Sequence, residues 1–270
     1  MAAEIRTDAA SDALARQMHV LQAIYEDEPG NRRRLWALRE SPEYERPFEE
    51  ENPLVTVYIP TYSNAEDLAR RSIPSVLAQT YDNLEILVIG DAASPAVEAA
   101  ARSFDDPRLR FLNLGIRGPY PDDPVELWRV AGTAPTNEGL GLAKGQWIAL
   151  NCDDDAFTPD HVELLLAEAR SRRLEYVYGD MRRIDPDRED AVMCTFPPRN
   201  EHFGVQAGLL HRGLRIFHHE LLVFGNGGDW AWMRRMLRLG VRIGMINDVV
   251  VDYYPSNRWG TPDLEPGTLG

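Results

Sequence analysis

Two apolar runs joined by one helical segment constrain the fold of this chain most. Residues 55–59 and 84–89 are continuous runs of aliphatic and β-branched residues, and apolar positions recur at helical spacing through the intervening segment 66–79. Strands that are apolar on both faces indicate a sheet covered on both sides. A strand, a helix and a second strand in this order therefore predict a βαβ unit with parallel strands. Pro74 lies inside the helical segment, so we expect a kink there.

The same alternation continues along the chain, which favours an α/β fold with a mostly parallel sheet flanked by helices. Further strands are predicted at 109–112, 147–150, 176–178, 241–246 and 249–254, and further helices at 96–104, 138–144, 162–169 and 230–239.

The first 51 residues are predicted to form a separate helical extension. Leu14, Met18, Leu21 and Tyr25 share one face of a first helix, and a second short helix is predicted at 32–39. This apolar face must be buried, either against the rest of the chain, which we favour, or in a homodimer. We expect residues 52–255 to form the main domain and residues 256–270 an irregular tail.

Composition restricts the class of partner. The 270 residues carry a formal net charge of −14, and a surface of this sign repels nucleic acid. An anionic nucleotide would need a local cation in order to bind. Two cysteines cannot form a disulfide framework, and neither a signal peptide nor a transmembrane segment is evident, so a cytoplasmic protein is expected.

Polar clusters occur where three of the predicted strands end, at residues 60–64, at Asp91 and at residues 153–155. Ligands of open α/β sheets bind beyond the carboxyl ends of the strands. A nucleotide site would explain why all three clusters occupy such positions.

The acidic run Asp153-Asp154-Asp155 predicts a metal site at the same edge. Adjacent carboxylates repel one another, and Mg²⁺ or Mn²⁺ prefers hard oxygen ligands together with substrate phosphates. The alternative is a solvated acidic turn at the start of the next helix, where carboxylates are also favourable. The position directly after a buried strand favours the metal.

Four segments resemble family 2 glycosyltransferases. These are residues 55–64, residues 72–91, the stretch 137–149 that begins Asn-Glu-Gly-Leu, and Asp153-Asp154 with Pro159 and His161 beyond. The resemblance covers about residues 53–255 and implies the GT-A fold, which is Rossmann-like. It also implies an inverting enzyme of the hexosyltransferase type, which moves a sugar from a nucleotide diphosphate-sugar to an acceptor hydroxyl.

The resemblance assigns a nucleotide-binding role to five positions. Tyr62 is expected to stack on or flank the base, with Pro60 and Thr61 lining it. Asp91 is expected to accept a hydrogen bond from the base, and Asp153 to lie near the ribose and the metal.

The resemblance also assigns the metal and the catalytic base. Asp154 is expected to bind Mn²⁺ or Mg²⁺ between the two phosphates, together with Asp153. Asp229, at a predicted helix start, resembles the general base that deprotonates the acceptor hydroxyl. The alternative for Asp229 is a helix N-cap, a role that Asp fills well.

Some positions depart from the family pattern. Gly90-Asp91-Ala92-Ala93 retains one Asp but lacks a glycine, Thr136 stands where Arg is common, and Gly228 stands where Glu often precedes the base. The proline-rich loop 118–124 is also unusually long.

Four further residues are weaker candidates for phosphate or acceptor contacts. Arg117 and Arg129 flank the loop, and His218 and His219 form a pair. Ordinary surface or packing roles are the alternatives for all four.

Three other functions are alternatives for a chain of this kind. A nucleotide-sugar pyrophosphorylase normally has a glycine-rich basic loop where this chain has Thr61–Asn64, and an NAD-dependent oxidoreductase needs a glycine motif that is absent here. A non-catalytic relic that binds only nucleotide or glycan has no need for all four of the aspartates Asp91, Asp153, Asp154 and Asp229.

The donor is expected to be a UDP-sugar, with GDP- or dTDP-sugars next. The acceptor is expected to be a glycan, a lipid carrier or a small molecule.

Overall fold

The computed structural model describes residues 2–185, 191–221, 223 and 227–255. The helices are α1 (Ala2–Arg39), α2 (Arg46–Glu49), α3 (Ala65–Asp67), α4 (Ile73–Leu77), α5 (Pro95–Arg102), α6 (Pro124–Val130), α7 (Thr133–Leu142), α8 (His161–Arg172) and α9 (Gly228–Leu239). The strands are β1 (Val55–Thr61), β2 (Leu84–Gly90), β3 (Leu109–Asn113), β4 (Trp147–Leu150), β5 (Ala156–Phe157), β6 (Tyr176–Arg183), β7 (Ala191–Val192), β8 (Gly208–His211) and β9 (Ile243–Tyr253).

One mixed sheet organises the fold, with strand order β3-β2-β1-β4-β8-β6-β9-β5 and β7 paired to β6. Strands β3, β2, β1 and β4 are mutually parallel, β8 is antiparallel to both of its neighbours, and β6 runs parallel to β9. The predicted α/β class and the leading βαβ unit are therefore confirmed. Because β1, β2 and β4 are parallel neighbours, their carboxyl ends meet at one edge.

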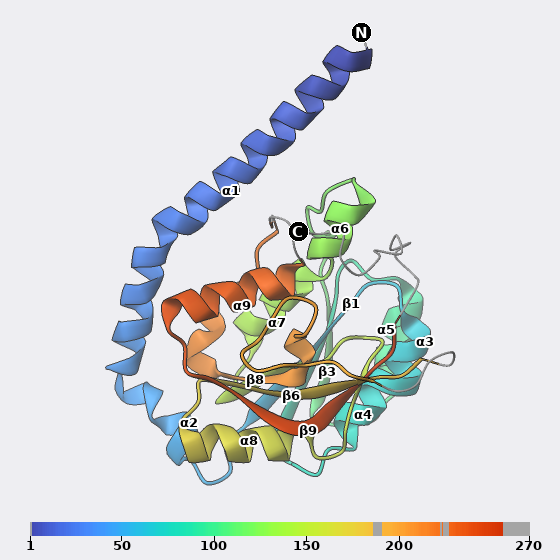
Figure 1. Ribbon diagram of the computed structural model, residues 1–270. Helices are drawn as coiled ribbons and strands as arrows, with labels where there is room; N and C mark the ends of the chain where they lie inside the picture. The colour runs from blue at the N-terminus through green and yellow to red at the C-terminus, as the bar shows by residue number, and fades with distance from the viewer. Residues whose placement is uncertain (1, 186–190, 222, 224–226, 256–270) are drawn as a thin grey trace.

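The centre of the sheet is buried on both faces, as the continuous apolar runs predicted. Every residue of β2 and β4 is buried, and so are all residues of β1 except Pro60. Helices α7 and α9 lie on one face, and α4 and α8 lie on the other (Figure 1). The core is continuous across these layers.

The helical segment after β1 is interrupted before Pro74, as expected. Helix α3 passes into a π-helical stretch, Leu68–Ser72, which is followed by α4 with Pro74 in its first turn. Proline has no N–H to donate to the preceding turn, so the local register changes where the proline enters.

The N-terminal extension differs from the prediction. The two expected helices are one continuous helix, α1, which runs through Pro29 and projects from the body (Figure 1). Leu14, Met18 and Leu21 are 59%, 62% and 47% exposed. The favoured packing of this face against the rest of the chain is therefore wrong for these three residues, and the Tyr25 side chain lies outside the described part.

The segment that follows is part of the main core. Leu35 is fully buried, and the rings of Tyr44 and Phe48 pack against His211. The indole N–H of Trp147 donates to the Pro47 carbonyl at 3.0 Å. Residues 35–48 thus belong structurally with the sheet.

Five of the α-helices and strands have no counterpart in the prediction: α2, α6, β5, β7 and β8. The two predicted C-terminal strands form one long strand, β9. The predicted tail, 256–270, lies outside the described residues.

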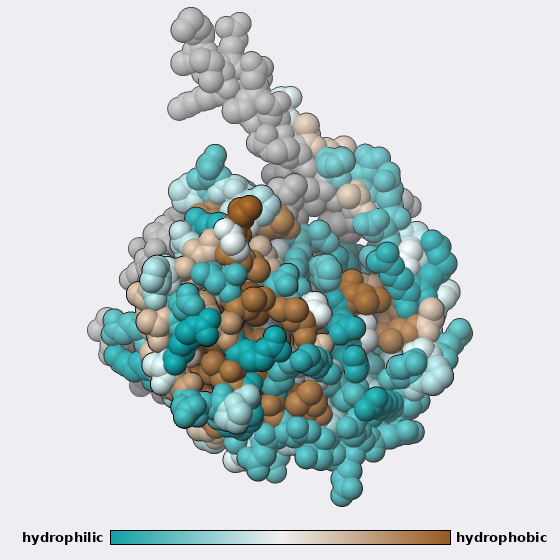
Figure 2. Space-filling view, turned by 180° about the vertical axis from the view of Figure 1, so that it is seen from behind, coloured by the Kyte–Doolittle hydropathy of each residue, from teal (hydrophilic) through white to brown (hydrophobic). Residues whose placement is uncertain are grey.

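In the part of the chain that the structure describes, no helix is both long and apolar enough to cross a bilayer. Figure 2 shows a largely hydrophilic surface on one side of the molecule, with apolar residues gathered near its centre.

Candidate functional site

The polar strand ends line one pocket of about 200 Å³. Strand β1 contributes its last residues and Tyr62, β2 leads into Asp91, and β4 leads into the acidic run. The start of α7 and the loop after β3 complete the wall. The lining residues are Pro60, Thr61, Tyr62, Asp91, Arg117, Tyr120, Ala131, Gly132, Pro135, Cys152, Asp153 and Asp154. All six residues predicted for the nucleotide and the metal, including Asp154, are brought together here.

Asp91 is held at the pocket wall by the loop after β3. The residue is 2% exposed. Its Oδ1 accepts a hydrogen bond from the Gly118 N–H at 2.9 Å, and its Oδ2 accepts one from the Tyr120 hydroxyl at 2.6 Å. Sequence reasoning did not single out Tyr120, although it lies within the long loop that marked a departure from the family.

The turn after Asp91 explains how the chain manages without the family's glycine. Ala92 adopts the left-handed region with φ of 51°, which L-residues disfavour. The side chain of Asn113 accepts from the Ala93 N–H at 2.8 Å and donates to the Ala93 carbonyl at 2.9 Å. This clamp from β3 holds the turn in place.

Of the two candidate arginines, Arg117 lines the pocket and Arg129 is not among its lining residues. The Arg117 guanidinium lies 4.1 Å from the ring centroid of Tyr62, a cation–π distance. Its Nε is buried without a hydrogen-bond partner. Arg129, whose side chain is mostly buried, forms an ion pair with Glu126 on the same helix at 2.6 Å.

The acidic run is positioned by hydrogen bonds from β1 and from the helical segment after it. Thr61 Oγ1 donates to Asp153 Oδ2 at 2.7 Å, and Asn64 Nδ2 donates to the Asp153 carbonyl at 3.2 Å. Arg71 Nη1 donates to the Asp154 carbonyl at 2.9 Å. The backbone of the run is thereby held against the pocket.

Asp155, to which sequence reasoning gave no separate role, is the most buried member of the run. It is 1% exposed and accepts hydrogen bonds from the Tyr254 N–H at 2.9 Å and from Gln206 at 3.1 Å. Burial, followed by the neighbouring charge of Asp154, raises its pKa to about 7. The third carboxylate of the run was the available signal.

Ligand atoms of Cys152, Asp154 and Asp155 lie within 4.8 Å of one another. The two carboxylates carry like charges and repel each other, and a hard divalent cation such as Mn²⁺ or Mg²⁺ between them would offset this repulsion. The Cys152 thiol is a poorer ligand, because burial and the nearby carboxylates raise its pKa well above its ordinary value. The residues present therefore fit a cation bound mainly through oxygen.

Asp229 lies in the first turn of α9, but it is not the N-cap. Gly227 occupies that position and makes no side-chain cap. Burial raises the pKa of Asp229 to about 6, against a partly compensating hydrogen bond with the Val205 backbone. Its charge also raises the pKa of Cys152 and of the Tyr58 hydroxyl, so it lies near the acidic run.

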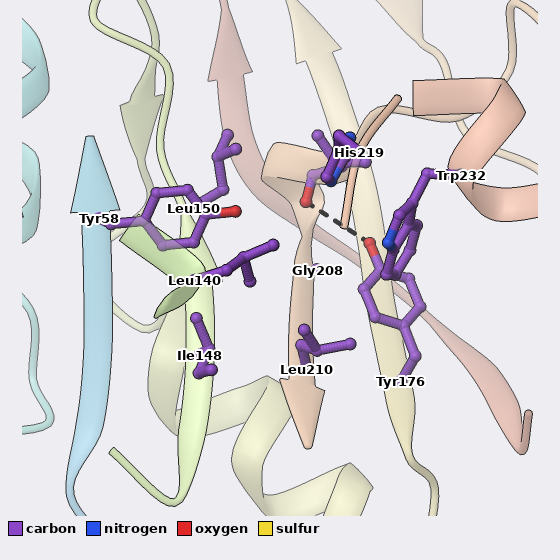
Figure 3. A pocket seen from close by; sticks show the side chains of 10 residues that line it. Tyr58, Leu140, Ile148, Leu150, Tyr176, Gly208, Leu210, His219 and Trp232 are labelled. Carbon is purple, nitrogen blue, oxygen red and sulfur yellow. Dashed lines mark hydrogen bonds between the residues drawn. The ribbon is translucent and has the colours of Figure 1, made fainter. Parts of the chain in front are cut away.

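The histidine pair belongs to the packing around α9. His219 helps to line an apolar cavity of about 20 Å³ between the sheet and α9, together with Tyr58, Tyr176 and Trp232 (Figure 3). The His219 and Trp232 rings stack with centroids 5.5 Å apart, and burial lowers the pKa of His219 to about 3. His218 is exposed. Neither histidine is among the residues that line the larger pocket.

Asn137 links this packing to α7. Its Nδ2 donates to the His219 carbonyl at 2.9 Å, and its Oδ1 accepts from the His219 N–H at 2.8 Å. The Trp232 indole donates to the Phe217 carbonyl at 2.9 Å. The segment 217–219 is therefore held between α7, which borders the pocket, and α9, which carries Asp229.

Comparison with known proteins finds similarity to glycosyltransferases. Residues 56–120 match the family described as Glycosyl transferase family 2. The succinoglycan biosynthesis protein ExoO of Rhizobium meliloti is 32% identical over 179 residues, which are 64% of this chain and 47% of that protein. The putative colanic acid biosynthesis glycosyl transferase WcaA of Escherichia coli is 30% identical over 118 residues, 43% of this chain and 38% of that protein. The chain spans less than half the length of these relatives.

Solved structures show the same fold at low sequence identity. Staphylococcus aureus TarS, residues 1–349 in complex with UDP-GlcNAc, superposes with a TM-score of 0.60 at 14% identity, covering 77% of this chain and 61% of that one. A mannosyltransferase from Pyrobaculum calidifontis in complex with GDP-Man and Mn²⁺ gives a TM-score of 0.56 at 17% identity, covering 90% and 69%. Residues 56–120 of this chain are therefore similar to family 2 glycosyltransferases, and the chain has the GT-A fold of these solved structures.

Proposed function

We propose that this chain is a metal-dependent, inverting glycosyltransferase that moves a hexose from a UDP-sugar to an acceptor hydroxyl. One observation carries the proposal. Asp91, Asp153 and Asp154 line one pocket, and Asp229, whose pKa is raised to about 6, lies near the same acidic run. The first part of this sheet falls in the segment, residues 56–120, that matches family 2 glycosyltransferases.

The donor is assigned to the 200 Å³ pocket. Tyr62, Pro60 and Thr61 would contact the base and ribose, and Asp91 would accept a hydrogen bond from the base. Arg117, whose Nε has no partner, adds positive charge beside an otherwise acidic wall. The two solved relatives named above bind UDP-GlcNAc and GDP-Man, respectively.

Asp154 and Asp155 would hold Mn²⁺ or Mg²⁺, with Asp153 beside them. The cation would absorb the negative charge of the departing diphosphate. The chain prepares this role by holding the acidic backbone rigidly, through Asn64 and Arg71, before any ligand arrives.

Asp229 is assigned as the general base. The acceptor hydroxyl would lose its proton to Asp229 as its oxygen bonds to the anomeric carbon, and the bond from that carbon to the diphosphate breaks on the opposite face. A pKa of about 6 suits this role, because the carboxylate is ionised at neutral pH yet more basic than an exposed Asp. A single displacement needs no enzyme nucleophile. Asp229 is not the N-cap of α9, which removes the main structural alternative for its presence.

The acceptor class is proposed from one further relative. One relative is named as a glucosyltransferase of Escherichia coli, WfgD, that acts on a GlcNAc-diphosphoundecaprenol with UDP-Glc, and it is 28% identical over 132 residues, 49% of this chain and 47% of that protein. We propose a glycan or a lipid-linked glycan as the acceptor and cytoplasm as the compartment, where nucleotide sugars are the donors.

The experiment that tests the proposal is a thermal-shift screen of UDP, GDP and dTDP with Mn²⁺ and with EDTA. A ligand that binds only the native state adds about 2.7 kcal/mol at 100-fold saturation, so at least one nucleotide should raise the melting temperature in a manganese-dependent manner. Asp154→Ala should remove this shift, whereas Asp105→Ala, at an exposed carboxylate away from the pocket, should keep it. Equal shifts with EDTA and with Mn²⁺ would contradict metal dependence, and no shift with any nucleotide would contradict the donor site.

A further inference from the structure

The loop after β3 supplies two hydrogen bonds to Asp91, the carboxylate assigned to the base. The Gly118 N–H and the Tyr120 hydroxyl each donate to a different oxygen. A carboxylate accepts at about four positions, so the chain itself occupies one position on each oxygen. With the residue only 2% exposed, little of the carboxylate remains accessible to a ligand.

These two bonds are built into the loop. The Tyr120 N–H donates to the Gly118 carbonyl at 2.8 Å, which closes a tight turn. A Cβ at position 118 would lie 2.6 Å from Cζ of Tyr120, so only glycine lets the ring fold back against the loop. The Ala134 N–H, at the start of α7, donates to the Tyr120 hydroxyl at 3.2 Å. The hydroxyl is thus oriented to donate to Asp91.

Arg117 anchors the same loop at a second point. Its guanidinium lies 4.1 Å from the Tyr62 ring centroid and 5.4 Å from that of Tyr120. The loop therefore rests on both residues that the base is expected to contact, Tyr62 and Asp91, and forms part of the base slot.

The nucleobases differ in what they demand of Asp91. Uracil and thymine present one ring N–H between two carbonyl oxygens. Guanine presents two adjacent N–H groups and needs both carboxylate oxygens side by side. Because each oxygen of Asp91 already accepts a bond and the carboxylate is almost covered, one further donor fits better than two.

We infer that Tyr120 and Gly118 determine base specificity by presenting Asp91 as an acceptor for a single imide, so that the site takes uracil or thymine nucleotides and discriminates against guanine. The inference rests on the proposed function, since it concerns the same donor site. It also gives a role to the long loop by which this chain departs from the family pattern.

The test compares UDP, dTDP and GDP by isothermal titration in the presence of Mn²⁺. The wild type should bind UDP and dTDP at least about tenfold more tightly than GDP, the effect of roughly one hydrogen bond to a charged group. Tyr120→Phe frees one oxygen of Asp91, and Gly118→Ala pushes the Tyr120 ring away. Both variants should narrow the ratio of UDP to GDP affinity by at least about threefold.

The ratio of UDP to GDP affinity separates a role in specificity from simple loosening of the loop, because loosening would weaken the binding of all three nucleotides equally. Tyr81→Phe, which removes a hydroxyl bonded to the Pro53 carbonyl outside the pocket, is the control and should keep the wild-type ratio. GDP binding as tight as UDP in the wild type, or an unchanged ratio in both loop variants, would overturn the inference and leave the proposed function standing. If none of the three nucleotides binds, the proposed function fails and the inference fails with it.

Discussion

Replacing Asp229 by Asn should make the protein more stable and less active at the same time. Burial is the main cause that raises the pKa of Asp229 to about 6, from an ordinary value near 3.9. The folded protein therefore holds this carboxylate in its ionised form at neutral pH against a cost in free energy. The asparagine side chain has nearly the same shape and carries no charge, so it avoids that cost.

The magnitude follows from the pKa difference. About two pH units separate the two values, and each corresponds to about 1.4 kcal/mol, which gives an upper bound of about 3 kcal/mol. Asp229 is partly exposed, so solvent screening reduces the figure to roughly 1–2 kcal/mol. The cost is absent below the unfolded pKa, grows as the pH rises from about 4 to about 6, and is complete above the folded pKa.

Urea unfolding of the wild type and of Asp229→Asn at pH 4.5 and pH 7.5 measures this cost. The variant should be about 1–2 kcal/mol more stable at pH 7.5, with a smaller gain at pH 4.5. Transfer to an acceptor should fall by about 10²–10⁴-fold, with donor affinity nearly unchanged. A variant that is no more stable than the wild type at pH 7.5, with the same dependence on pH, would refute the argument from burial. Full transfer activity would refute the assignment as base.

Three further predictions concern the surroundings of the pocket. Asp155→Asn should weaken Mn²⁺ binding in isothermal titration by about 10–100-fold, and unchanged affinity would remove Asp155 from the cation site. Asn137→Ala removes both hydrogen bonds to the His219 backbone and should lower the transfer rate about tenfold at unchanged donor affinity. The control Glu138→Ala, at the exposed neighbouring residue, should match the wild type. A parallel loss of donor affinity in Asn137→Ala would show that Asn137 supports the pocket as a whole. Ala92→Gly relieves the left-handed φ of 51°. It should raise the free energy of unfolding by up to about 1.5 kcal/mol, the balance of about 1–2 kcal/mol of strain and about 0.5–1 kcal/mol of backbone entropy. A loss of stability in urea unfolding would contradict the strain.

The sheet edge that forms the pocket could be predicted because its signals are local. The runs at β1, β2 and β4 are apolar on both faces, and each is followed directly by polar residues. Parallel pairing then places those residues at one edge, without further information. This reasoning located Tyr62, Asp91 and Asp153 correctly in space, while their roles remain predictions.

The parts that sequence did not reveal depend on contacts between distant segments. Tyr120 contacts Asp91 across 29 positions, and Asn137 contacts His219 across 82. No periodicity encodes such pairs, because each is set by how loops settle on a finished sheet. The burial of Asp155 was not predicted for a related reason, since it depends on Tyr254 and Gln206, which come later in the chain.

The boundary of the N-terminal extension gives the last prediction. Glu175 is fully buried and accepts hydrogen bonds at 2.7 Å from Arg39, through two nitrogens, and from the Tyr44 hydroxyl. Although burial opposes ionisation, these donors lower its pKa below the ordinary value, so its contribution to stability is present at neutral pH and is lost only as the pH falls through that lowered value.

Removing one partner of such a buried pair typically costs about 3–5 kcal/mol, and Glu175→Ala should therefore lower the free energy of unfolding by that amount at pH 7. Glu168→Ala breaks an exposed pair with Arg172 on helix α8 and should cost less than about 1 kcal/mol. If the two variants unfold at the same urea concentration, the Arg39 contact is not what ties this segment to the core. If the contact does tie the segment to the core, deleting residues 2–27 should leave stability nearly unchanged. Deleting residues 1–50 removes Arg39 and Tyr44 and should destabilise the whole domain, so the structural boundary lies inside α1 and not at residue 51.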